Sequence, residues 1–314
     1  MHYGTNRTLP VSGSGIAPFD HRRADLRLFL LTLFCLTLFA LNSILCRAAL
    51  ITWGMEPLQY TAVRSLSAAA MLAFLCLSRV IKPQEQAGSI WKQVWQQSSW
   101  AGGMCLFMYM LSFSLAYVSI PSAAGTLILN ISVQFGMVGW GIYQGVNPNR
   151  RQVSGLAIAF VGLAALMSPG LTAPPLVSSL LMVVAGLAWA GYTLCGRAAT
   201  SAPLATAGNF FRCAVAGTVT AVLALCLEGS AHPLAYLCAL AAGALASALG
   251  YTLWYAVVPR YSLVGSSIIQ LSVPLITAVL AVILLSEAIT LRLVVCAVPI
   301  LGGICLALLA KKNT

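Results

Sequence analysis

Charged residues are scarce in this sequence. Asp, Glu, Lys and Arg make up 7% of its 314 residues, whereas soluble domains carry about 25%. Hydrophobic residues make up 60% of the chain, and the mean hydropathy is +0.92. This composition indicates an integral membrane protein and leaves no room for a soluble catalytic or DNA-binding domain. The net charge of +11 is therefore attributed to basic loops on one side of a membrane, and no nucleic-acid partner is expected.

Titratable side chains are rarer still inside the apolar segments. The chain has six acidic residues and three histidines, and all of them fall outside or at the ends of the predicted spans. No metal ion or other cofactor is therefore expected. Because proton relays in membranes normally use buried Asp, Glu or His, their absence favours facilitated diffusion or exchange over proton-driven antiport. Glu287, at an external end, is the best remaining proton carrier, and pairing with Arg47 or Arg292 is the alternative expected for it.

Catalytic motifs are missing as well. The apolar segments contain no paired aspartates for prenyl diphosphates, no HExxH motif, no P-loop and no Ser/His/Asp set. The ten cysteines form no CxxC pair and are interpreted as buried free thiols. We therefore predict that the protein is not an enzyme, with a membrane hydrolase or lipid transferase as the enzymatic alternative.

What the sequence does contain is a series of apolar segments of about 20 residues, the length that crosses a bilayer. Lys and Arg gather in the tail formed by residues 1–26 and in the loops that follow the even-numbered segments. The positive-inside rule therefore places both termini in the cytoplasm. Tryptophans at 91, 95 and 100 are interpreted as interfacial anchors. The ten predicted spans are 28–45, 57–78, 98–118, 122–143, 153–169, 176–196, 206–227, 234–258, 262–285 and 291–310.

A polar stripe runs along the fourth predicted span. Ser122, Thr126, Asn130 and Gln134 are spaced four residues apart, which places them on one face of a helix. Each unpaired polar group in hydrocarbon costs several kcal/mol, so this face is expected to contact protein or a wet cavity.

The stripe has a counterpart about 140 residues later, in residues 262–274. Each half of the chain, 27–170 and 171–312, would hold five spans. Because five is odd, the two halves must have opposite orientations in the membrane. The sequence thus predicts an all-α integral membrane protein with ten transmembrane helices in two inverted five-helix repeats, an architecture typical of alternating-access transporters. In register, the identical or similar pairs include Ser122/Ser262, Gly125/Gly265, Thr126/Ser266, Ile128/Ile268, Asn130/Gln270, Ser132/Ser272, Val133/Val273 and, outside the stripe, Arg64/Arg212.

The second half resembles an EamA-type unit of the drug/metabolite transporter superfamily. The matching features are Trp189, Arg212, Pro274, Glu287 and the pair Gly302-Gly303. The first half is a weaker match, and the resemblance covers about residues 28–310. It implies ten helices, two inverted repeats and export of small metabolites such as amino acids. The first half departs from the second at three places, where Phe39, Gln134 and Asn147 stand in register with Trp189, Pro274 and Glu287; the fourth span is therefore expected to bend less.

Candidate substrate-binding residues come from polar and aromatic side chains inside the spans. Arg64 and Arg212 could attract a carboxylate substrate, or they could snorkel and bind helix-end carbonyls. The amides of Asn130 and Gln270 suit a polar or zwitterionic solute, and hydrogen bonding between packed helices is their alternative role. The aromatic candidates could line a cavity or belong to the core. The candidate cavity residues are Asn42, Arg64, Tyr109, Thr126, Asn130, Gln134, Trp189, Tyr192, Tyr251, Trp254, Ser266 and Gln270.

These patterns predict an alternating-access transporter in a bacterial inner membrane, an exporter or exchanger of small metabolites such as amino acids or drug-like compounds. The cavity is expected among spans one, three, four, six, eight and nine. A nucleotide-sugar or other polar-solute carrier, or a passive channel, of the same fold remains the alternative. The expected partners are a small-molecule substrate and the lipid bilayer. The sequence leaves the oligomeric state open, and a monomer is compatible with it.

Overall fold

The computed structural model describes residues 21–78, 80–82, 89–145, 149–167, 173–196, 200–226, 231–257, 260, 269–270 and 272–309. Within these ranges every regular element is a helix. Seven helices are long and apolar enough to cross a membrane, and two shorter apolar helices cover Ser272–Leu285 and Leu291–Ala307. The protein is therefore an all-helical integral membrane protein.

Most predicted spans match the helices to within a few residues at each end. The predicted ninth span, 262–285, begins outside the described residues, and its described helix is α12. The first helix is longer than its predicted span, because α1 begins in the polar residues before the apolar run and continues through an apolar π-helical segment, η1. The eighth span is one continuous helix whose middle, η2, is π-helical. The helices are α1 (His21–Arg47), η1 (Ala48–Thr52), α2 (Pro57–Leu77), α3 (Ile90–Gln97), α4 (Trp100–Tyr117), α5 (Ser122–Tyr143), α6 (Arg150–Met167), α7 (Leu176–Gly196), α8 (Ala202–Leu225), α9 (Pro233–Ala241), η2 (Ala242–Leu249), α10 (Gly250–Val257), α12 (Ser272–Leu285) and α13 (Leu291–Leu309).

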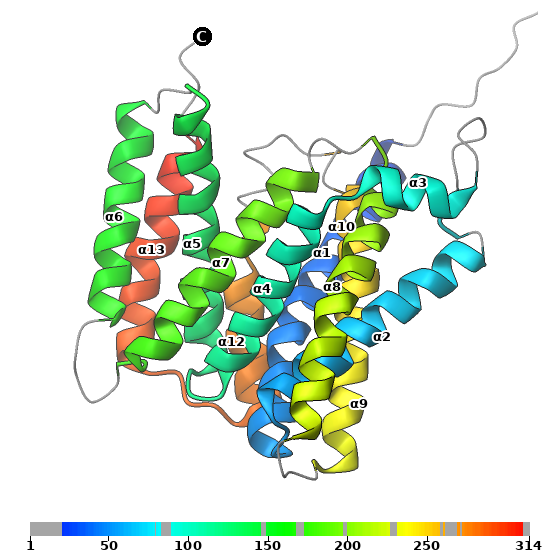
Figure 1. Ribbon diagram of the computed structural model, residues 1–314. Helices are drawn as coiled ribbons and strands as arrows, with labels where there is room; N and C mark the ends of the chain where they lie inside the picture. The colour runs from blue at the N-terminus through cyan, green and yellow to red at the C-terminus, as the bar shows by residue number, and fades with distance from the viewer. Residues whose placement is uncertain are drawn as a thin grey trace, which may run out of the picture.

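Helix α3 is an element that the sequence did not predict as a helix. It lies across the ends of spanning helices near the top of the view in Figure 1, and packs against α8. Ser89 caps its first turn by accepting a hydrogen bond from the Lys92 amide. Its buried residues are Gln93 and Val94, and Trp91 is partly exposed. This amphipathic pattern suits a helix at the membrane–water interface.

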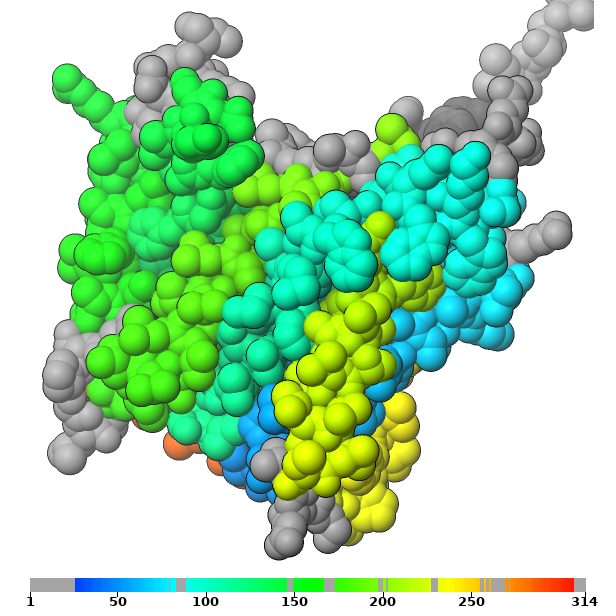
Figure 2. Space-filling model, in the orientation of Figure 1, coloured from blue at the N-terminus to red at the C-terminus, as the bar shows by residue number. Residues whose placement is uncertain are grey.

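Helices that are distant in the sequence lie side by side. α6 packs along α13, α4 along α7, α2 along α8, and α1 along α12. α5, α6 and α13 form a group at one side of the molecule, with α2, α8 and α9 at the other (Figure 1). In the same orientation, Figure 2 shows α7, α4 and α8 as adjoining strips of one surface. Each of the four packed pairs, α6 with α13, α4 with α7, α2 with α8 and α1 with α12, joins a helix of the first half to a helix of the second half.

Glycines permit the closest of these approaches. A Cβ atom at Gly155 of α6 would collide with the carbonyl oxygen of Gly303 in α13, and a Cβ atom at Gly303 would collide with that of Gly155. A Cβ atom at Gly103 of α4 would lie 2.6 Å from the Cβ of Arg212 in α8. A Cβ atom at Gly243 of η2 would collide with the carbonyl oxygen of Arg64 in α2. Small residues at helix contacts are the usual means of close packing in membranes.

Candidate substrate-binding cavity

A cavity of about 50 Å³ lies between the two halves of the chain. Its walls come from α1, α4, α5, α7 and α10 and from the segment that leads into α12. These correspond to the six spans that the sequence predicts for a central cavity. A volume of this size holds a few water molecules and is well below the roughly 300–1,000 Å³ of typical small-molecule sites. The lining residues are Phe39, Asn42, Ser43, Tyr109, Phe113, Thr126, Leu129, Asn130, Val133, Trp189, Tyr251, Gln270 and Val273.

The polar stripe of α5 faces the protein interior. Ser122, Thr126, Asn130 and Gln134 are all buried. The Thr126 hydroxyl donates to the carbonyl oxygen of Ser122 over 2.7 Å, and the Asn130 amide donates to that of Thr126 over 2.9 Å. The side chains of Thr126 and Asn130 thus donate to backbone carbonyl oxygens one helical turn earlier in α5. Thr126 and Asn130 line the cavity, whereas Gln134 does not.

Aromatic rings form the wall opposite the stripe. The rings of Trp189 and Tyr251 are 4.7 Å apart between centroids, and those of Tyr109 and Trp189 are 5.0 Å apart. The ring of Phe39 packs edge-on against Tyr251 at 5.7 Å. Because these rings come from α1, α4, α7 and α10, they hold four helices in one apolar contact.

Three more of the predicted residues are buried without lining the cavity. The Tyr192 hydroxyl donates to Thr206 over 3.3 Å. Trp254 packs against Phe39 with 5.6 Å between ring centroids. Gln134 lies one turn beyond Asn130 on α5. Ser266 lies outside the described residues.

Arg64 lies directly behind the aromatic wall and is completely buried. Its Nε donates to the Ser247 hydroxyl over 3.1 Å. Its Nη2 donates to the hydroxyls of Tyr109 and Tyr251 over 3.3 Å and 3.4 Å. The guanidinium also lies 5.2 Å from the ring centroid of Phe113. Three of these neighbours, Tyr109, Tyr251 and Phe113, line the cavity, so one layer of side chains separates the charge from the cavity.

Arg212, the counterpart of Arg64 in the second half, has a different environment. Its guanidinium lies 4.4 Å from the ring centroid of Trp95 and 5.6 Å from that of Trp100. It donates to the Ser98 hydroxyl and, over 3.3 Å, to the carbonyl oxygen of Trp95. These contacts join α8 to the segment around α3, away from the cavity, and favour the structural alternative for Arg212.

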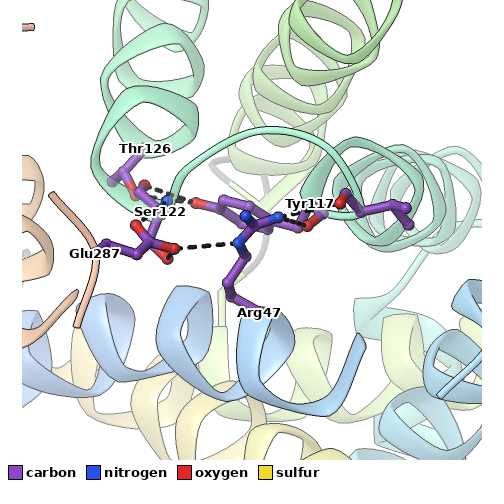
Figure 3. Close-up of polar contacts among 6 residues, drawn as sticks. Arg47, Tyr117, Ser122, Thr126 and Glu287 are labelled. Carbon is purple, nitrogen blue, oxygen red and sulfur yellow. Dashed lines mark hydrogen bonds and ion pairs between the residues drawn. The ribbon is translucent and has the colours of Figure 1, made fainter. Parts of the chain in front are cut away.

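A polar network lies one turn of α5 beyond the cavity (Figure 3). Arg47 forms an ion pair with Glu287, with 3.1 Å between Nε and Oε1, and donates to the carbonyl oxygen of Tyr117 over 2.7 Å. Glu287 accepts the Ser122 amide over 2.8 Å and the Ser122 hydroxyl over 3.0 Å. The Tyr117 hydroxyl shares a hydrogen bond of 3.0 Å with Thr126. Of the two predicted partners for Glu287, Arg47 is confirmed.

Several lining residues did not emerge as candidates from the sequence. Phe113 follows Tyr109 by one helical turn, and Ser43 follows Asn42, so the sequence spacing could have indicated both as cavity residues. Leu129, Val133 and Val273 are apolar residues within apolar helices, and nothing in the sequence distinguishes them from residues that face lipid. Among the described residues, no group of three or more His, Cys, Asp or Glu side chains is arranged to hold a metal ion.

Comparisons with known proteins identify the class. The model of the EamA-like transporter family matches residues 176–309. A Pseudomonas aeruginosa protein named "Uncharacterized protein PA1977" is 39% identical over 288 residues, which cover 90% of this chain and 95% of that protein. The chain belongs to the EamA-like transporter family.

Two more distant similarities agree with this assignment. A protein of Archaeoglobus fulgidus named "Uncharacterized transporter" is 25% identical over 197 residues, which cover 59% of this chain and 65% of that protein. A crystal structure with 19% sequence identity superposes with a TM-score of 0.62 over 90% of this chain and 99% of that chain, and shows a shared fold. This protein is therefore a transmembrane transporter.

Proposed function

We propose that this transporter is an alternating-access carrier that exports or exchanges small polar metabolites, such as amino acids or drug-like compounds, across a bacterial inner membrane. The observation that carries the proposal is the cavity between the halves, whose walls contain polar side chains of α1 and α5 together with aromatic rings. Polar side chains inside membrane spans are costly and commonly mark a substrate pathway.

The proposal includes ten helices in two inverted repeats, 27–170 and 171–312, after a cytoplasmic tail of residues 1–26. Support comes from reciprocal contacts. Gly155 and Gly303 meet each other's backbone, and this contact joins the last helix of the first half to the last helix of the second half. Gly103 meets Arg212 while Gly243 meets Arg64, so each half places its third span against the second span of the other half. A pseudo-two-fold axis in the membrane plane would produce such pairs.

Transport then requires the cavity to widen and to open on alternate sides. At about 50 Å³ the cavity would have to grow several-fold to hold a metabolite. The network of Arg47, Glu287 and Ser122 closes one end by joining α1, the α4–α5 turn and the loop after α12. With both termini in the cytoplasm, as the positive-inside rule predicts, this closed end faces outward. Rocking of one helix group against the other would break the network.

Counterflow in proteoliposomes is the direct test. Vesicles loaded with an unlabelled solute from a panel of amino acids, nucleosides and cationic drugs should accumulate the labelled solute transiently, because a carrier must return through the same site. Asn130→Leu and Gln270→Leu, which remove cavity-lining amides, should reduce that flux at least about 10-fold. Gln134→Leu is the matched control, since Gln134 is buried on the same stripe but does not line the cavity.

The alternatives have distinct outcomes in the same assay. A passive channel would show continuous, non-saturable conductance and no counterflow. A nucleotide-sugar carrier would show no counterflow with this panel but would show it with a nucleotide sugar added to the assay, which would refute the substrate class but not the mechanism. Wild-type rates in both Asn130→Leu and Gln270→Leu, with normal expression, would assign these amides to helix packing and refute the proposed site.

A further inference from the structure

Arg64 is a cation in the protein interior, and no acidic side chain in the described part of the chain pairs with it. Its hydrogen bonds all go to neutral hydroxyl groups, those of Ser247, Tyr109 and Tyr251. Its Nη1 atom is buried and has no hydrogen-bond partner. An arginine within a membrane-spanning helix normally pairs with an acid or with backbone carbonyls. The charge of Arg64 is therefore not compensated by the residues that the structure describes around it.

Three polar groups converge on the hydroxyl of Tyr109. Its oxygen is approached by Nη2 of Arg64 at 3.3 Å, by the Asn42 amide at 3.2 Å and by the Tyr251 hydroxyl at 3.3 Å. A hydroxyl has two lone pairs and one proton, so Tyr109 can accept from Arg64 and Asn42 while it donates to Tyr251. The Nη1 donor of Arg64 and the Oδ1 acceptor of Asn42 remain without partners, and the cluster of Arg64, Asn42, Tyr109 and Tyr251 contains no negative charge.

The cluster borders the cavity. Asn42, Tyr109 and Tyr251 are all among its lining residues, so their polar groups can reach a solute while Arg64 stays behind them. Ser247, which fixes the other edge of the guanidinium, lies in the π-helical segment η2. π-helical turns within helices are frequent at functional sites. Two helices thus fix the guanidinium beside the cavity wall: α2 carries Arg64, and η2 carries Ser247, which accepts its hydrogen bond.

We propose that the cavity binds the carboxylate of a small solute with a flat apolar body, and that Arg64 supplies the opposite charge through the hydroxyls of Tyr109 and Tyr251. The inference rests on the proposed function, because it takes the cavity as the transport site. The carboxylate provides the missing negative charge. The rings of Phe39 and Trp189 provide faces for a flat body. Arg64 is a positioning residue, since the tyrosines lie between it and the solute.

Two probes of nearly equal shape test the charge requirement. Phenylacetate carries a carboxylate, and phenylacetamide replaces it with a neutral amide. Dissociation constants are measured for each probe by thermal-shift titration of the purified full-length protein in detergent. The wild type should bind phenylacetate at least about 10-fold more tightly than phenylacetamide. Arg64→Gln should bring the ratio close to one, and Arg64→Lys should retain part of the preference. If Arg64 were only structural, Arg64→Gln would weaken the binding of both probes by the same factor. The ratio of the two dissociation constants would then persist, and this result would overturn the inference.

A second variant keeps the test decisive if Arg64→Gln does not fold. The double change Tyr109→Phe with Tyr251→Phe keeps both rings and Arg64 but removes the hydroxyls that face the cavity. It should lower the phenylacetate preference several-fold, whereas Tyr192→Phe, whose hydroxyl bonds Thr206, should leave it unchanged. An unaltered preference in the double variant refutes the inference. Equal competition by chloride at the same concentration also refutes it, because the site would then accept any small anion.

The two proposals fail in different ways. If no solute of any charge shows counterflow, the carrier function itself is wrong. If neutral or cationic solutes show counterflow and phenylacetate has no advantage over phenylacetamide, the carrier function stands and only the carboxylate specificity is wrong.

Discussion

Arg47 of α1 and Glu287, after α12, form an ion pair across 240 residues of sequence (Figure 3). Both side chains are largely buried, with 17% and 15% of their surfaces exposed. Glu287 also accepts two hydrogen bonds from Ser122 at the N-terminus of α5, where the helix dipole favours a negative charge. Breaking such a partly buried pair costs more than breaking a surface pair, because each charge would be left without its partner.

Glu287→Gln should therefore open the outer end of the cavity. The neutral amide cannot hold Arg47 as strongly, so the closed state should lose population. A cysteine introduced at Ser43, which lines the cavity, should then react several-fold faster with a membrane-impermeant thiosulfonate added from outside. Glu56→Gln is the matched control, since Glu56 is exposed at the start of α2. Equal labelling rates in the two variants would show that the ion pair does not hold the cavity closed.

Two adjacent glycines of α13 should respond in opposite ways to alanine. A Cβ atom at Gly303 would collide with the backbone of Gly155, whereas a Cβ atom at Gly302 meets nothing within 4 Å. Gly303→Ala should lower the thermal stability in detergent, by about 1–3 kcal/mol as for other overpacked sites. Gly302→Ala should leave it unchanged or raise it by up to about 1 kcal/mol, because alanine favours helix. Similar changes in both variants would contradict the contact between α6 and α13.

Sequence periodicity could predict which faces of helices are buried, but not which residues meet across helices. The spacing of Thr126 and Asn130 placed them on the interior face of α5, and the structure places both at the cavity. Gln134 has the same spacing, yet it lies beyond the cavity's end. The end of a cavity depends on the tilt of neighbouring helices, which one helix's own sequence does not determine.

The two arginines illustrate the same limit. Arg64 and Arg212 occupy matching positions in the sequence, so the sequence assigned them the same two alternative roles. In the structure the environments of the two arginines differ, because α3 and its tryptophans have no counterpart among the described residues near Arg64. α3 itself could not be predicted as a membrane span, since it has only eight residues, IWKQVWQQ, half of them polar. Its helical form depends on its cap and on packing against α8.

Arg212→Lys should reduce stability without changing transport selectivity. The lysine ammonium can still approach the Trp95 ring, but it cannot stack on it or reproduce the hydrogen bonds to Ser98 and to the carbonyl oxygen of Trp95. A loss of about 0.5–2 kcal/mol is expected from these contacts. Thermal unfolding in detergent measures the loss, and the ratio of phenylacetate to phenylacetamide binding should equal that of the wild type. A changed ratio would place Arg212 in the solute site after all.

Transport should be insensitive to pH between 6 and 8 and to an imposed pH gradient. None of the residues that line the cavity is Asp, Glu or His, so no group in its wall has an ordinary pKa in this range. Glu287 is not among the lining residues and forms an ion pair with Arg47. Counterflow in proteoliposomes should thus proceed at the same rate with equal internal and external pH and with a gradient of one unit. Flux that follows the gradient in the wild type and is lost in Glu287→Gln would instead make Glu287 the proton carrier. Protonation of Glu287 would then break its ion pair with Arg47 and so open the cavity.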